Sequence, residues 1–107
     1  LYCLEKEIWI CFFGINIGSE QDGQGPNFLR PVLVIKVINS QTFLGIPITT
    51  KIHHDPYYIK FNLGAFDQWA IISQIRLLSV RRLQRFVGVM TNDYFQTVVS
   101  SIRKILP

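Results

Sequence analysis

Cysteine is scarce, charge is sparse and long apolar runs are absent in this sequence of 107 residues. The two cysteines, Cys3 and Cys11, lie near one another in a single strand-like run, whereas a disulfide framework uses more cysteines at loop positions. The apolar run from Ile8 to Phe13 is far too short for a membrane-spanning helix or for the core of a signal peptide. We therefore expect reduced thiols in a cytoplasmic protein that has no membrane anchor.

The length and the low charge also limit the assembly. The chain is too short for two hydrophobic cores, so we expect a single domain over residues 1–107. Charged residues make up 17% of the sequence and hydrophobic residues 49%, an apolar excess that favours a homodimer. The net charge of +4 favours an anionic partner, either a nucleic acid or an acidic protein segment. Basic residues that only solvate the surface are the alternative.

Most of the chain has the pattern of β-strands. Runs rich in β-branched and aromatic residues alternate with turn signals, which is typical of short extended segments. The expected strands are Ile8 to Phe13, Val32 to Ile38, Thr42 to Ile48, Tyr57 to Phe61, Trp69 to Ser73, Arg76 to Val80 and Gln84 to Met90.

Only the end of the chain predicts a helix. Thr91 or Asn92 can cap its start, and basic residues suit its last turn. Its apolar residues at helical spacing are Phe95, Val98, Val99, Ile102 and Leu106, followed in the last turn by Arg103 and Lys104. Short strands followed by one packed helix predict a mainly β fold with a C-terminal α-helix, a small curled antiparallel barrel.

A candidate phosphate site follows from the longest loop. Residues 14–29 form a polar, glycine-rich stretch that is too long for a hairpin turn, and such loops are often functional. Arg30 comes directly after it, at the start of a hydrophobic strand. Thr49, Thr50 and Lys51 lie where the next strand ends. A guanidinium, two hydroxyls, an ammonium and loop amides together suit a phosphate group.

Four sequence blocks carry a family resemblance. They are Gly18-Ser19-Glu20-Gln21, Arg30-Pro31-Val32-Leu33-Val34, Ile46-Pro47-Ile48-Thr49-Thr50 and Ser73-Gln74-Ile75-Arg76. In order and spacing they resemble those of MazF/PemK toxins. The resemblance implies an SH3-like barrel shared with CcdB toxins, a homodimer, an antitoxin partner and no metal or cofactor. It also implies cleavage of single-stranded RNA to 2',3'-cyclic phosphate and 5'-hydroxyl ends.

The resemblance also implies site residues. Arg30 matches the family's catalytic arginine, and Thr49 matches its catalytic threonine. Ser73 stands where several family members have an acidic residue, so the fourth block supplies no carboxylate. The expected RNA-binding residues are Ser19, Gln21, Phe28, Thr50, Lys51, Tyr57, Gln74 and Arg76, with Gln74 as a buried structural amide as the alternative.

Several alternatives stay open at this point. The general base that accepts the 2'-hydroxyl proton is Glu20, His53 or His54. Adjacent histidines on an extended segment point to opposite faces, so the pair does not predict a metal site. The basic group Arg76, Arg81, Arg82 and Arg85 either follows an RNA backbone or solvates the barrel edge and binds an acidic antitoxin tail.

Two other functions compete with RNA cleavage. One is a non-catalytic toxin on the same barrel that binds a protein, as the gyrase poison CcdB does. The other is a relative that binds RNA without cutting it. Arg30 and Thr49 together favour the endoribonuclease.

Overall fold

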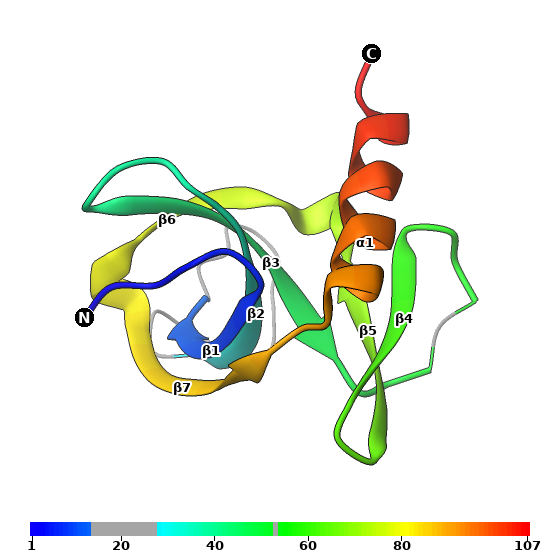
Figure 1. Cartoon of the computed structure of the whole chain (residues 1–107), viewed down its shortest axis with the longest axis horizontal. Helices are drawn as coiled ribbons and strands as arrows, with labels where there is room; N and C mark the ends of the chain where they lie inside the picture. The colour runs from blue at the N-terminus through cyan, green and yellow to red at the C-terminus, as the bar shows by residue number, and fades with distance from the viewer. Residues whose placement is uncertain (14–27, 53) are drawn as a thin grey trace.

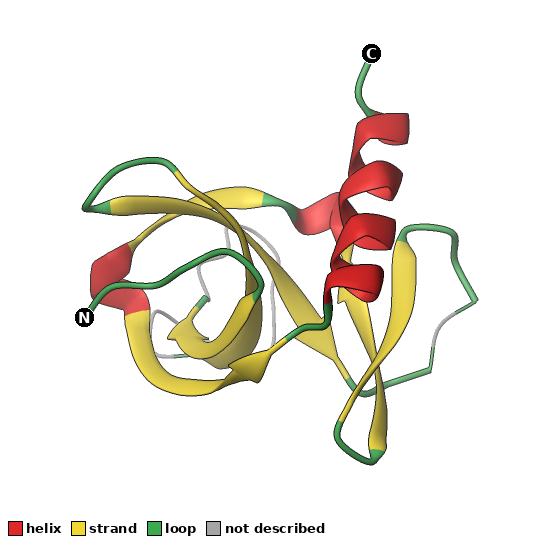
Figure 2. Ribbon diagram, in the orientation of Figure 1, coloured by secondary structure: helices red, strands yellow, loops and turns green. Residues whose placement is uncertain are grey.

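The computed structural model describes residues 1–13, 28–52 and 54–107. The strands and turns follow one another along the chain and end in a single long helix (Figures 1 and 2). In order, the elements are β1 (Glu7–Phe12), β2 (Leu29–Val37), β3 (Thr42–Thr49), β4 (Tyr58–Leu63), β5 (Phe66–Ile71), the 3-10 turn η1 (Ile72–Gln74), β6 (Arg76–Ser79), the 3-10 turn η2 (Val80–Arg82), β7 (Leu83–Val89) and α1 (Asn92–Ile105).

The expected mainly β fold with one C-terminal helix is confirmed. All strands pair antiparallel, in the order β4-β5-β3-β2-β1-β7, and β6 pairs with β3 as well. Because β6 continues through η2 into β7, and β7 pairs with β1, this part of the sheet curls into a barrel (Figure 2). Within the described ranges the hydrogen-bonded ladder stays open between β6 and β7. No helix there is long and apolar enough to span a membrane.

β3 organises the sheet because one of its edges has two partners. Its first half, Thr42 to Gly45, pairs with β6, and its last residues, Ile48 and Thr49, pair with β5. The turn η1 carries the chain from β5 to β6 along this edge. Pro47 lies in the gap between the two partners, where its missing N–H breaks no ladder hydrogen bond on that edge.

The largest differences from the predicted boundaries are at β5 and at β2, which begins at Leu29 and not at Val32. The strand expected from Trp69 to Ser73 begins at Phe66, because a turn at Gly64, with a φ of 71°, brings Phe66 opposite Leu63. The sequence pattern did not predict the start of β5 at Phe66, because the polar pair Asp67 and Gln68 interrupts the apolar run. Thr91 takes the N-cap position of α1, but its side chain makes no capping hydrogen bond.

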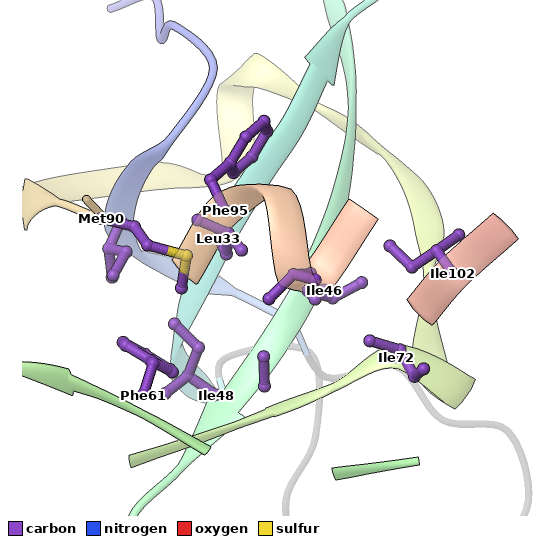
Figure 3. Packing of buried hydrophobic residues seen from close by; sticks show 11 residues of the cluster. Leu33, Ile46, Ile48, Phe61, Ile72, Met90, Phe95 and Ile102 are labelled. Carbon is purple, nitrogen blue, oxygen red and sulfur yellow. The ribbon is translucent and has the colours of Figure 1, made fainter. Parts of the chain in front are cut away.

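Alternation along the strands divides the apolar residues between two cores. The helix-side core lies between the sheet and α1, and in Figure 3 Leu33 lies beside Phe95 and Ile72 beside Ile102. The barrel core lies inside the curl. It consists of Cys3, Trp9, Cys11, Phe13, Val32, Val34, Phe43, Leu78 and Leu83. Consecutive residues of β1 and β2 therefore enter different cores, as expected when both faces of a sheet are packed.

Candidate functional site

Arg30 lies at the open end of the barrel core. It is the second residue of β2 and pairs with Cys11 in the β1–β2 ladder, so the two side chains share a face. Its guanidinium lies 5.2 Å from the centroid of the Phe28 ring. Burial lowers the pKa of Arg30, while an electrostatic interaction with Tyr58 acts in the opposite direction. The guanidinium is thus half-buried beside the Phe28 ring and interacts electrostatically with Tyr58.

Thr49 lies on the same face as Arg30. The β2–β3 ladder pairs Val32 with Pro47, and Arg30 and Thr49 each lie two residues beyond this pair towards the same end of the sheet, so alternation puts both on its face. Thr49 Oγ1 accepts a hydrogen bond of 3.1 Å from the Lys51 N–H. Its own O–H has no acceptor among the described residues. This hydroxyl is therefore oriented by the chain and still able to donate to a ligand.

The β4–β5 hairpin extends this face. Thr49 pairs with Trp69 of β5, and Trp69 pairs in turn with Lys60 of β4. Tyr58, two residues before Lys60, is on the same face and lies near enough to interact electrostatically with Arg30. This neighbour of Arg30 was not predicted. The only signal for it is the strand register, which one sequence does not provide.

Two further arginines hold the end of β1. The Arg82 Nη1 donates to the Phe12 carbonyl at 3.0 Å. The Arg76 Nη1 donates to the Phe13 carbonyl at 3.4 Å, and its guanidinium lies 4.8 Å from the centroid of the Phe13 ring. The basic group predicted from the sequence is therefore split, because Arg81 and Arg85 are exposed and make no such contacts.

The two arginine positions are joined through their phenylalanines. The Phe13 N–H donates to the Phe28 carbonyl at 2.9 Å, which connects the end of β1 to the start of β2. The Phe28 ring contacts Arg30, and the Phe13 ring contacts Arg76. Arg30, Arg76 and Arg82 consequently gather at one end of the barrel, around these backbone and ring contacts.

This end of the barrel is positively charged without a described counter-charge. Within residues 1–13, 28–52 and 54–107, the only ion pair joins Lys60 and Asp67, at 3.4 Å. The Glu7 carboxylate accepts from the Leu4 N–H and the Trp9 indole N–H instead. Such an arrangement suits an anion that brings its own charge.

The other predicted residues do not join Arg30. Gln74 is exposed at the end of η1, which corrects the alternative of a buried amide: the turn puts Ile72 inside and Gln74 outside. Thr50, Lys51, His54 and Tyr57 are exposed between β3 and β4, and no described hydrogen bond, ion pair or ring contact links them to Arg30. Ser19, Glu20, Gln21 and His53 lie outside the described residues.

The residues described here hold no group of three or more His, Cys, Asp or Glu side chains that could bind a metal ion. The site as described therefore consists of a guanidinium, a hydroxyl, a phenol and the two further arginines. These groups can hold a phosphate and donate hydrogen bonds to it.

Comparison with known proteins gives one family and one fold. Residues 5–106 match the family model described as PemK-like, MazF-like toxin of type II toxin–antitoxin system. No curated relative matches the chain.

Among solved structures, MazF (form I) from Deinococcus radiodurans has a TM-score of 0.80 at 16% identity, over 98% of this chain and 96% of that one. An endoribonuclease with its cognate antitoxin from a mycobacterial species has a TM-score of 0.74 at 14% identity, over 98% of this chain and 97% of that one. The Mycobacterium tuberculosis toxin MazF-mt6 has a TM-score of 0.69 at 15% identity, over 92% of this chain and 93% of that one. These likenesses establish the fold.

Proposed function

Because the chain belongs to the PemK-like, MazF-like toxin family of type II toxin–antitoxin systems, we propose that it is a metal-independent endoribonuclease that cleaves single-stranded RNA. One observation carries the proposal. The half-buried guanidinium of Arg30 has no carboxylate partner among the described residues and shares a sheet face with the free O–H of Thr49. This pair can bind the two nonbridging oxygens of a phosphodiester.

The proposed reaction is a transphosphorylation. The ribose 2'-oxygen loses its proton to a base and attacks the adjacent phosphorus. The bond from phosphorus to the 5'-oxygen then breaks, and the leaving 5'-oxygen takes up a proton. The phosphorane between these steps carries extra negative charge, which Arg30 stabilises with two N–H groups and Thr49 with one O–H. The products are a 2',3'-cyclic phosphate and a 5'-hydroxyl end.

The proton acceptor is a group other than Arg30. A guanidinium stays protonated at physiological pH and so cannot take the 2'-hydroxyl proton. Glu20, His53 and His54 remain the candidates, and of these only His54 is among the described residues, where it is exposed. Each candidate is replaced singly by Gln or Ala, and the pH–rate profiles of the variants are compared. The general base is the residue whose replacement removes the acidic limb of the profile.

The aromatic residues suggest how bases are held. Tyr57 is 43% exposed and its N–H is fixed to the Asp55 carboxylate at 2.7 Å, so the backbone beneath it is ordered. An exposed ring of this kind can stack on an unpaired base. Phe28 has one neighbour already, the Arg30 guanidinium, and is better suited to positioning that group.

We also propose a homodimer and a cognate antitoxin as partners. Large apolar side chains that are exposed in the single chain include Leu29, Phe66, Leu77, Phe86 and Val89. A second copy can cover part of this surface. Among similar structures is a MazE–MazF complex from Deinococcus radiodurans, which supports an antitoxin partner by analogy. Sedimentation velocity at micromolar concentration tests the dimer, and a strictly monomeric species contradicts it.

Cleavage of a mixed-sequence RNA in excess EDTA tests the enzymatic function, with the new termini identified by mass spectrometry. Arg30→Ala and Thr49→Ala serve as matched controls against a contaminating nuclease. We expect cyclic-phosphate ends from the wild type only. A protein that binds RNA without cutting it supports the catalytically inactive relative. A protein that does not bind or cut RNA supports a CcdB-like protein-binding toxin. Activity that needs added Mg²⁺ contradicts the proposed chemistry.

A further inference from the structure

Arg76 and Arg82 form a pair that the proposed reaction leaves without a role. They come from the start of β6 and the end of η2, and they converge on the consecutive carbonyls of Phe13 and Phe12. Each uses its Nη1 for this contact. The remaining N–H groups of the two guanidiniums have no hydrogen-bond acceptor among the described residues.

The two charges also lie close enough to repel. Burial lowers the pKa of Arg76, and the positive charge of Arg82 lowers it further. No carboxylate in the described part of the chain is within 4.0 Å of either guanidinium. Two partly buried like charges disfavour the folded state unless an anion neutralises them. A neutral donor would satisfy each carbonyl equally well without that cost.

The position of Arg76 and Arg82 suits a single-stranded RNA that is already bound at Arg30. Contacts run from Arg76 to the Phe13 ring, from the Phe13 N–H to the Phe28 carbonyl, and from the Phe28 ring to Arg30. An RNA whose scissile phosphate lies at Arg30 must continue past it, with one negative charge at every nucleotide. Planar guanidiniums match the oxygens of such a phosphate in pairs.

We propose that Arg76 and Arg82 form a second phosphate-binding site, which takes a neighbouring phosphodiester of the RNA that is cleaved at Arg30. This inference rests on the proposed function. The site contributes to affinity for the strand and stays outside the bond-breaking step. Arg81 and Arg85, which are exposed and contact none of these groups, have no part in it.

The test uses Arg82→Gln and Arg82→Lys in the full chain. Glutamine removes the charge and retains an N–H donor for the Phe12 carbonyl. Lysine retains the charge but lacks the planar pair of N–H groups of a guanidinium. Arg103→Gln is the matched control, since Arg103 is exposed on α1 and its side chain has no described partner. Thermal unfolding checks that each variant folds. Affinity for a non-cleavable 2'-O-methyl RNA of the cleaved sequence is then measured between low and moderate KCl.

We expect Arg82→Gln to weaken RNA binding about tenfold and to reduce the slope of log Kd against log salt by about 0.7, as for one lost phosphate contact on a single strand. The loss should appear in KM more than in kcat. Arg82→Lys should retain most of the slope, and Arg103→Gln should match the wild type. Arg76→Gln should reproduce the loss of Arg82→Gln.

Three results overturn the proposal. An unchanged salt slope in Arg82→Gln, with normal cleavage, removes the second site and leaves the proposed function intact. A fall in kcat without a change in slope makes Arg82 a structural clamp on β1. Loss of affinity for an acidic antitoxin peptide with unchanged RNA binding assigns the pair to that partner. A wild-type protein that neither binds nor cuts RNA contradicts the proposed function itself, and this inference falls with it.

Discussion

The helix-side core and the barrel core share β1, β2 and β3, yet they differ at the ends of these strands. The helix-side core is covered by α1 and contains only apolar side chains, such as Phe61 and Val98. The face of the barrel core changes from apolar to polar residues along β2 and β3. In steps of two residues β2 presents Val34, Val32 and then Arg30, and β3 presents Gly45, Pro47 and then Thr49.

This difference shows that one face of a small sheet can serve packing alone while the other face also carries the functional side chains. β2 and β3 send alternate residues to the face that α1 covers, where packing is their only role. On the opposite face their residues pack for most of the strand, and the residue at the barrel's open end carries a polar group. Arg30 is therefore anchored by Val32 and Val34, the buried residues that follow it on its own face, which limits its motion at little entropic cost.

Truncating one phenylalanine in each core gives the largest expected effect. Phe61 and Phe43 are both fully buried, the first in the helix-side core and the second in the barrel core. Phe61→Ala and Phe43→Ala should each lower the free energy of unfolding by about 3–5 kcal/mol, measured by urea denaturation. Only Phe43→Ala should also slow RNA cleavage per folded molecule. Equal losses of activity in both variants would show that the two cores are not functionally separate.

A methyl group added to the barrel core gives an intermediate effect. A Cβ on Gly45 would lie 2.8 Å from the Val32 Cγ1, whereas a Cβ on Gly88 would lie no closer than 3.5 Å to Leu63. We expect Gly45→Ala to destabilise the fold by about 1–3 kcal/mol through overpacking. Gly88→Ala should change stability by less than about 0.5 kcal/mol. Thermal or urea unfolding measures both, and a neutral Gly45→Ala would mean that β2 and β3 can move apart.

Ionisation of the two thiols in the barrel core gives the smallest expected effect, a loss of stability that appears only at alkaline pH. Burial, followed by the proximity of Glu7, raises the pKa of Cys3 from 9.0 to about 11, and burial, followed by the proximity of Cys3, raises that of Cys11 to about 12. The fold thus favours the neutral thiols. Their contribution to stability is complete below about pH 9 and is lost as the pH rises towards 11–12.

Two measurements check this. Iodoacetamide at pH 8 should modify neither cysteine in the native protein, as read by mass spectrometry, because the thiolate is the reactive form. The alkaline loss of stability should be shallower in Cys11→Ala. Rapid native alkylation of Cys11 would show that the barrel core opens readily.

Sequence patterns predicted the strands well and the site only in part. Alternating and continuous apolar runs together identified all seven strands, and the continuous runs are explained by β1, β2 and β3, which pack on both faces. The start of β5 and the turn η1 were not predicted, because they depend on which half of β3 is free to pair. Pairing of this kind is a long-range property that local composition does not encode.

The candidate site shows the same limit. Arg30 and Thr49 were found through the family's blocks, and the strand register explains why they belong together. The basic group near η2 was predicted as one cluster, yet a 3-10 turn and the irregular β1–β7 register send Arg82 to the Phe12 carbonyl and leave Arg85 exposed. Neither irregularity has a sequence signal that one chain reveals.

The role of Arg30 is best tested by comparing Arg30→Lys with Arg30→Ala in single-turnover cleavage, alongside RNA binding and circular dichroism. If the two N–H groups of the guanidinium hold two phosphoryl oxygens of the phosphorane, lysine cannot replace them although it keeps the charge. Both variants should then lose about 10²- to 10³-fold in turnover and much less in affinity. An Arg30→Lys variant that cuts RNA within about threefold of the wild type would show that Arg30 acts through charge alone, and would contradict the proposed mechanism.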